Sequence, residues 1–165
     1  MANHLPDDLY NEIIAWLPWA SPDEWHRVAF GWNWGFGSDI LRWITRQPEC
    51  DKATALLIFW YGEPSYYWSD NLEQTGNRLA DRSSNNDDFH LLGEIMSSWR
   101  SKSYTRAELA FDPRSLYIKP EYVEKSANHP TLAITADMIQ PLRGRTLAAA
   151  GDFIEGLPPH IKHIN

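Results

Sequence analysis

Hydrophobic residues recur at helical spacing through the first two-thirds of the chain, which predicts a series of short amphipathic helices. Proline and acidic residues open the first segment, and both are typical of a first helical turn. Serine or aspartate stands at the expected start of several others, where its side chain can cap a helix. The predicted helices lie within residues 5–18, 21–30, 38–48, 50–62 and 88–102.

The clearest helix start in the sequence is at Ser21. Ser21 and Glu24 have the spacing of a capping box, in which each side chain binds the backbone N–H of the other residue, and Pro22 occupies the first helical position. Ser38 and Asp51 are predicted to cap two further helices. The helix that follows Asp51 is apolar almost all round, so we expect it to lie at the centre of the fold.

An aromatic segment connects two of the predicted helices. Residues 31–37 read GWNWGFG, and the rings of Trp32, Trp34 and Phe36 alternate with glycine and asparagine. The glycines and the helix start at Ser38 favour a tight connection over a strand. The rings are expected to pack between helices, and the alternative is an exposed stacking platform.

The last third of the chain is richer in proline and less regular. Thr105 and Glu108 have the spacing of a second capping box, and short helices are expected near 119–127, 135–140 and 146–155. No set of strands is convincing, so the fold class is all-α. We expect a single compact multi-helix domain over residues 1–157, with a Trp-rich core and a looser Pro-rich C-terminal third. Residues 158–165 are expected to form a C-terminal tail.

Charge is the next informative feature of the chain. The formal net charge is -7, and residues 1–100 contain 15 acidic and 7 basic side chains, a balance of -8. An acidic protein repels phosphate backbones, which argues against a nucleic-acid partner. The charge suits a basic protein partner, because complementary charge speeds encounter, and it also keeps a protein soluble.

Cysteine content and hydropathy bear on the compartment. A single cysteine, Cys50, excludes an internal disulfide framework, as expected in a reducing cytosol. The N-terminal residues lack the pattern of a signal peptide, and the longest apolar run, residues 55–61, is too short to span a membrane. We therefore expect a cytoplasmic protein with no membrane partner.

The sequence contains no catalytic signature that we recognise, and no metal or cofactor is expected. His160 and His163 are three residues apart, but no carboxylate or cysteine near them completes a zinc site. Cys50 precedes a helix start, where a thiolate is stabilised, yet no motif pairs it with a histidine, so a small buried residue is expected. Arg143 and Arg145 form a short basic spot, which is expected to pair with acids of the same domain rather than with phosphate.

A resemblance to a known family is carried by residues 32–64. This stretch contains the ordered motifs WNW, ILRWI, QPECDKATALLIFW and a final proline, and the later YTRAELAFD and ITADMIQPLRGR fit the same pattern more loosely. It resembles the bacterial domain of unknown function 4274 (DUF4274), although Gly35, Phe36 and Gly37 replace an acidic turn. The resemblance implies a small helical cytosolic protein of the kind found beside secreted toxins, and it implies no activity, cofactor or catalytic residue.

The leading hypothesis is a non-catalytic protein-binding module, an acidic immunity-type protein that neutralises a bacterial toxin by direct binding. One alternative is a small-ligand-binding protein or enzyme that uses the aromatic loop, residues 31–43, together with His26, Asn33 and Asp39. Another is a structural adaptor without a toxin connection, and the oligomeric state is left open. The residues predicted to bind a basic toxin or effector are Asp7, Asp8, Asp23, Asp39, Glu63, Tyr66, Tyr67, Trp68, Asp70, Asp87 and Asp88.

Overall fold

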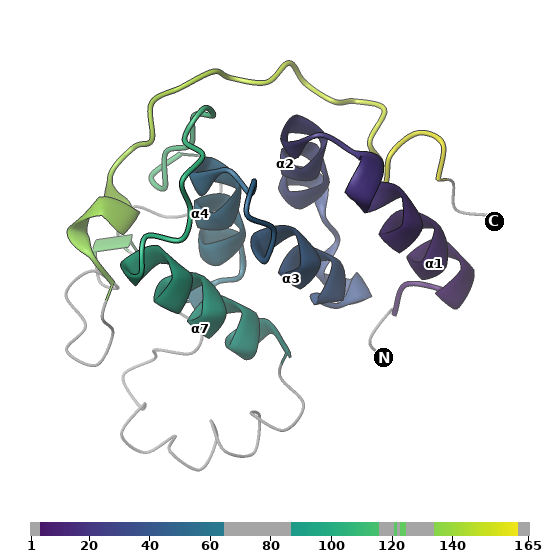
Figure 1. The fold of residues 1–165 in the computed structure, drawn as a ribbon, viewed down its shortest axis with the longest axis horizontal. Coiled ribbons are helices and arrows are strands. Elements are labelled where there is room, and N and C mark those ends of the chain that lie inside the picture. Colours follow the sequence, from purple (N-terminus) through teal and green to yellow (C-terminus); the bar gives the residue numbers. More distant parts are fainter. Residues whose placement is uncertain (1–3, 65–86, 116–120, 122, 125–133, 162–165) are drawn as a thin grey trace, which may run out of the picture.

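The computed structural model describes residues 4–64, 87–115, 121, 123–124 and 134–161. This part of the chain is helical and contains no strand or sheet, which confirms the all-α prediction (Figure 1). The α-helices are α1 (Asp7–Trp16), α2 (Pro22–Gly31), α3 (Asp39–Thr45), α4 (Lys52–Tyr61) and α7 (Asp87–Arg100). Three short 3-10 turns accompany them: η1 (Leu17–Trp19), η2 (Trp34–Phe36) and η3 (Ala136–Ile139).

Helix α4 lies at the centre of the fold, as its sequence predicted. Every side chain from Ala53 to Trp60 is buried, and α2, α3 and α7 pack around it. Each fully buried Leu, Ile or Phe side chain contributes about 1.5–3 kcal/mol relative to an exposed one. The indole Nε1 of Trp60 donates a hydrogen bond to the carbonyl oxygen of Met138 at 2.9 Å, so the central helix also binds η3.

Two of the three predicted cap residues Ser21, Ser38 and Asp51 make the expected capping bonds. The Ser21–Glu24 capping box is present, and Asp51 accepts a hydrogen bond from the N–H of Ala53 at 2.9 Å. Ser38 precedes α3 as predicted, but its side chain makes no capping bond. Its ψ of 2° departs from the extended backbone that directs a capping oxygen toward the amides of the first turn.

The aromatic segment is a helix-to-helix connection packed against the core. Trp32 is only 6% exposed, and its Nε1 donates to the carbonyl oxygen of Gly37 at 2.9 Å. Trp32 meets Phe36 edge to face, and Trp25 meets Trp43 in the same way, with ring centroids 5.7 and 5.5 Å apart. The burial of Trp32 confirms the core interpretation of this residue and leaves no exposed stacking platform there.

Two predictions about the C-terminal third were wrong. Residues 104–111 are extended rather than helical, because their backbone groups bind other segments: the carbonyl of Arg106 accepts from the N–H of Lys52 at 2.8 Å. Leu109 and Phe111 form isolated bridges with Arg145 and Leu142, so the predicted capping box of Thr105 and Glu108 is absent. Residues 146–155 are turns and extended backbone instead of a helix.

The predicted helix at 135–140 is the 3-10 turn η3, and most of the predicted helix at 119–127 lies outside the described residues. Residues 140–161, which we call the C-terminal strap, then cross the helices from η3 to α1 (Figure 1). Gly156 has a φ of 84°, and a Cβ there would lie 2.7 Å from the carbonyl oxygen of Val28, so glycine is required. His160 stacks edge to face on Trp16, and Ile161 is buried. The described part of the predicted tail therefore packs on the core.

Candidate functional site

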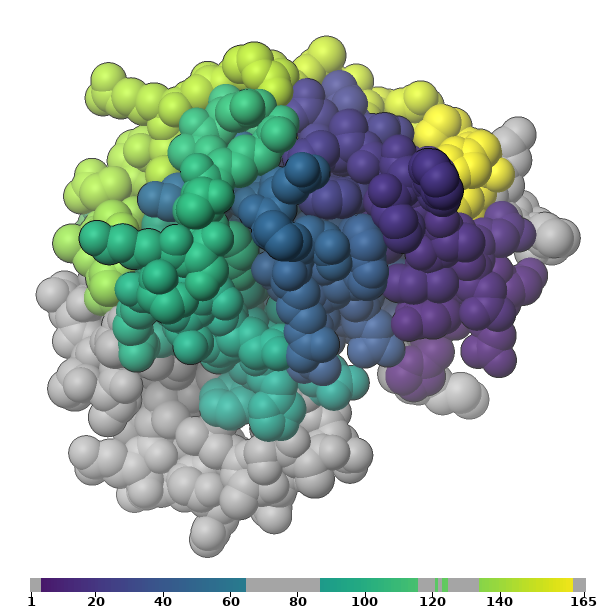
Figure 2. Space-filling view, viewed as in Figure 1, coloured from purple at the N-terminus to yellow at the C-terminus, as the bar shows by residue number. Residues whose placement is uncertain are grey.

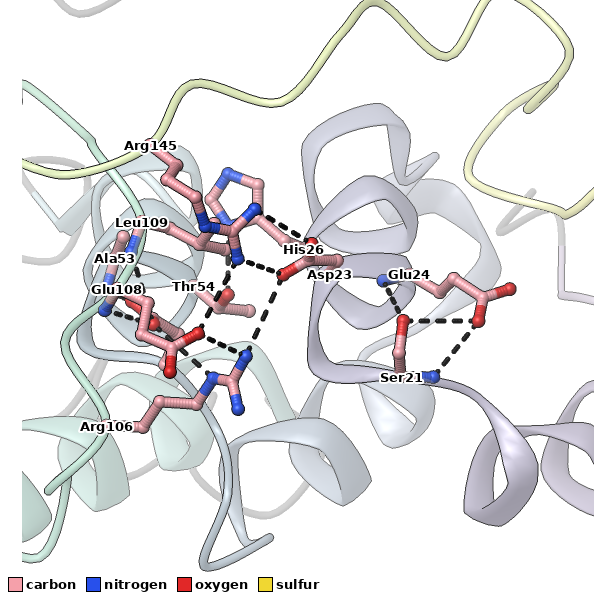
Figure 3. Close-up of polar contacts among 11 residues, drawn as sticks. Ser21, Asp23, Glu24, His26, Ala53, Thr54, Arg106, Glu108, Leu109 and Arg145 are labelled. Carbon is pink, nitrogen blue, oxygen red and sulfur yellow. Dashed lines mark hydrogen bonds and ion pairs between the residues drawn. The ribbon is translucent and has the colours of Figure 1, made fainter.

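A buried carboxylate, Asp51, joins the start of α4 to the extended segment 104–111. Its partners Ala53, Glu108 and Leu109 are labelled in Figure 3. Its side chain is fully buried, and Oδ1 caps α4 through the N–H of Ala53. Oδ2 accepts hydrogen bonds from the N–H groups of Glu108 and Leu109, at 2.8 and 3.3 Å. One residue thus starts the central helix and fixes the extended segment 104–111 against it.

Two arginines, Arg106 and Arg145, form ion pairs with the acids in this region. Arg106 binds Glu108 at 2.6 Å, and its Nε lies 3.7 Å from Oδ2 of Asp51. Arg145 binds both carboxylate oxygens of Asp23, at 3.1 and 3.2 Å, and also contacts Glu108 at 3.5 Å. The hydrogen bonds from Arg145 hold the pKa of Asp23 below its usual value. Arg145 therefore pairs with acids of its own domain, as predicted for the basic spot.

The ion pair with Arg145 argues against the prediction that Asp23 binds a partner protein. Asp23 is half-buried, and its two oxygens are occupied by a bidentate arginine that comes from the C-terminal strap. An arginine of a partner would have to displace that internal pair before binding Asp23. Its position thus favours a role in holding the strap onto α2.

His26, part of the ligand-site alternative, faces the interior. It is 9% exposed, and its Nδ1 lies 2.8 Å from the hydroxyl oxygen of Thr54, which links α2 to α4. Burial lowers the pKa of His26 to about 4, so the imidazole is neutral at pH 7. Asn33 caps its own turn by accepting from the N–H of Gly35 at 2.9 Å. Both polar groups of the aromatic loop region therefore have structural partners.

The structure also shows the surroundings of residues that could act as a nucleophile or a metal ligand. Cys50 is fully buried, its thiol donates to the carbonyl oxygen of Asp51, and burial raises the pKa of the thiol. This agrees with a small structural residue. In the described ranges no group of three or more histidine, cysteine or acidic side chains is arranged to hold a metal ion. His163 lies outside those ranges.

Four of the predicted acids face solvent at helix starts, and these starts lie at two places. Asp7 and Asp8 are exposed in the first turn of α1. Asp39 and Asp87 are exposed at the first residues of α3 and α7, which lie side by side and start at the same end (Figure 1). Asp88 is half-buried beside them, and burial raises its pKa. Two surfaces therefore carry exposed acids from the predicted set.

Arg42 stabilises the surface formed by the starts of α3 and α7. Its Nη2 donates to the carbonyl oxygen of Asp87 at 3.1 Å, while its Nε pairs with Glu94 at 3.1 Å. Arg46 binds the other oxygen of Glu94. These contacts fix α3 against α7 and leave the carboxylates of Asp39 and Asp87 outside the arginine pairs.

The remaining predicted residues are only partly covered by the structure. Glu63 is exposed just after α4, with a φ of 53°. The residues Tyr66, Tyr67, Trp68 and Asp70 lie outside the described residues, so their predicted role stays a prediction.

Sequence reasoning assigned no role to Trp19, which is 89% exposed. The signal was present in the sequence, because Trp19 follows Pro18 and falls off the buried stripe of Leu9, Ile13 and Leu17. The arginine pairs of Arg106 were also missed. The spacing of Thr105 and Glu108 predicted a helix start there, and two acids close to the guanidinium of Arg106, Asp23 and Asp51, are far away along the chain.

Comparison with known proteins supports the family resemblance. Residues 20–97 match the family described as Domain of unknown function (DUF4274). The match contains α2, α3, α4 and most of α7, and it leaves out α1, the segment 104–111 and the C-terminal strap. No curated protein and no solved structure matches the chain. Across the described ranges, every helix is too short or too polar to cross a membrane.

Proposed function

We propose that this chain, which carries a DUF4274-like domain, is a non-catalytic cytoplasmic protein-binding module of the immunity type. It neutralises a basic bacterial toxin or effector by binding it directly. The family has no assigned activity, so the proposal rests on the chemistry of this chain.

The observation that supports this proposal is the division of the acids into two groups. Asp23, Glu94 and Glu108 are neutralised by arginines that join helices and loops. Asp7, Asp8, Asp39 and Asp87 face solvent, and no ion pair with a described residue neutralises them. The second group therefore adds negative charge to the surface at the starts of three helices.

Such a field suits a partner with a basic surface. Complementary potentials steer the encounter and raise the association rate above the usual range for neutral proteins. A toxin whose active site is lined by lysine and arginine would be occluded by an anionic surface of this kind. Glu63 and the segment that contains Tyr66, Tyr67, Trp68 and Asp70 remain part of the predicted contact.

Co-expression tests the proposal directly. The product of the adjacent gene is expressed with and without this protein, and growth and co-purification are scored. Rescue of growth together with a stable complex is the expected result. Absence of both rescue and co-purification contradicts the proposal.

A charge-matched pair of variants tests the role of the acids. Asp39→Asn with Asp87→Asn removes two exposed acids of the α3 and α7 starts, and Asp152→Asn with Glu121→Gln removes two exposed acids elsewhere. The first pair is expected to slow association several-fold at low salt, and the control pair much less, because nearby charges dominate steering. Equal effects would show that only the net charge of the protein matters.

A further inference from the structure

Trp19 is an exposed aromatic side chain without a partner in the described part of the chain. It is 89% exposed, against 65% for Ile154 and 53% for Phe30, the other large hydrophobic side chains that are exposed in the described ranges. Phe30 contacts the ring of Tyr61, with centroids 6.2 Å apart, whereas the Trp19 ring meets no other described ring. Exposed Trp is uncommon, and Trp is among the residues most enriched at binding hot spots.

The backbone that carries Trp19 is held firmly. The N–H of Ala20 binds the carbonyl oxygens of Trp16 and Leu17, and the indole N–H of Trp25 donates to the same Leu17 carbonyl at 2.9 Å. Leu17 itself is fully buried. A rigid backbone presents the exposed ring in one place, so little backbone freedom is lost when a partner covers it.

Trp19 ends a stripe of exposed residues on the outer face of α1. Asp8, Glu12, Ala15 and Trp19 are spaced by four, three and four residues, and all are exposed. At the helical rise the stripe is about 16 Å long. Figure 2 shows α1, in dark purple, at the surface beside the yellow end of the C-terminal strap.

The charge of this stripe has one sign only. Residues 5–25 contain Asp7, Asp8, Glu12, Asp23 and Glu24 and no Lys or Arg. The first three lie on α1, and no described residue forms an ion pair with them. An arginine is the side chain that fits this surface best, because its guanidinium stacks on an indole and also binds carboxylates.

We infer that the outer face of α1 and η1 is the docking surface for a basic protein partner, with Trp19 as its anchor. The inference rests on the proposed function and names the surface that performs it. Trp19 contributes the buried centre of the contact, and Asp8 and Glu12 bind arginine or lysine side chains along the helix. The surface lies outside residues 20–97, the part of the chain that matches the DUF4274 family.

The test uses the full-length protein, labelled with ¹⁵N, and a synthetic amphipathic helical peptide rich in arginine and leucine. Backbone and indole N–H signals are followed during titration, and a peptide with glutamate in place of arginine serves as the probe control. The largest shifts are expected at the Trp19 indole and along α1. Trp19→Ala is expected to weaken binding by about tenfold, which is the loss of a moderate hot spot.

Two variants control for folding and for net charge. Trp19 is exposed, so Trp19→Ala is expected to keep the melting temperature within a few degrees of the wild type. Asp8→Asn with Glu12→Gln is expected to weaken peptide binding more than Asp152→Asn with Glu121→Gln, which remove the same charge.

The outcomes separate the two proposals. Shifts that gather at Asp39 and Asp87 while the Trp19 indole is unmoved overturn the α1 surface but keep an acidic docking surface. Concentration-dependent shifts of Trp19 without peptide show a second copy as the occupant, and they overturn the basic partner. Absence of any shift with the arginine peptide, together with no toxin rescue, overturns both the surface and the proposed function.

Discussion

Replacement of Asp51 by alanine is the sharpest test of how this fold is held together. The substitution removes the acceptor for three N–H groups, those of Ala53, Glu108 and Leu109, from a site that water does not reach. Loss of a helix cap costs about 1 kcal/mol. Each buried N–H left without a partner costs about 1–3 kcal/mol, and the bond to Leu109 at 3.3 Å is the weaker one.

These contributions together amount to about 3–5 kcal/mol, a large fraction of the 5–15 kcal/mol that is typical of a whole domain. For a protein of this size the melting temperature should fall by roughly 6–20 °C. Urea denaturation at pH 7, followed by tryptophan fluorescence, measures the loss. Asp39→Ala is the control, since an exposed acid at the start of α3 should change stability by less than about 0.5 kcal/mol.

Asp51→Asn separates the two functions of this side chain. The amide keeps one oxygen to cap α4, but its NH₂ group then faces the N–H donors of Glu108 and Leu109, where a carboxylate oxygen had accepted. Hydrogen exchange should become faster at Leu109 while Ala53 stays protected. A loss below about 1 kcal/mol for Asp51→Ala, or unchanged exchange at Leu109, would refute the reasoning.

Two further predictions concern a buried histidine and a glycine. The pKa of His26 is depressed to about 4 in the fold, so its neutral form stabilises the protein above the unfolded value near 6.5, and this stability is lost as the pH falls toward 4. The free energy of unfolding, measured by urea denaturation, should fall between pH 7 and pH 4.5 by up to about 2.4 kcal/mol more in the wild type than in His26→Asn. Gly144→Ala should destabilise by about 2 kcal/mol or more, because its Cβ would lie 2.4 Å from the carbonyl oxygen of Glu108. Gly151→Ala, whose Cβ meets nothing within 4 Å, should leave the urea midpoint nearly unchanged, and equal losses in the two glycine variants would contradict the packing argument.

Much of the helical fold was predictable because its signals are local. Ser21, Glu24 and Asp51 cap their helices through residues only two or three positions away, so the spacing in the sequence carries the information. The burial of α4 followed from its composition, since a helix that is apolar on every side finds no stable place at the surface.

The extended segment 104–111 was not predictable in this way. Its local sequence has the spacing of a capping box at Thr105 and Glu108, yet its backbone bonds go to Asp51 and to residues 142–145. Propensity for a helix is worth a few tenths of a kcal/mol per residue, whereas several well-formed hydrogen bonds to distant groups outweigh it.

The candidate site shows the same difference between information that is local in the sequence and contacts between distant residues. The sequence named acids at the helix starts, and charge alone argued for a basic partner. Only the tertiary structure showed that Asp23 is held by Arg145, which lies 122 positions away, while Asp39 and Asp87 stay outside such pairs.

By itself, the sequence determined the helical class, the helix caps at Ser21 and Asp51, the central place of α4 and the sign of the net charge. The tertiary structure decided which carboxylates are outside internal arginine pairs and that, among the described tryptophans, Trp19 is the one left largely in water. The physical reason is the separation along the chain of the residues that interact. A helix cap or an apolar stripe depends on residues within one or two helical turns of each other. Ion pairing and burial depend on which distant segments meet, and that is settled when the whole chain packs.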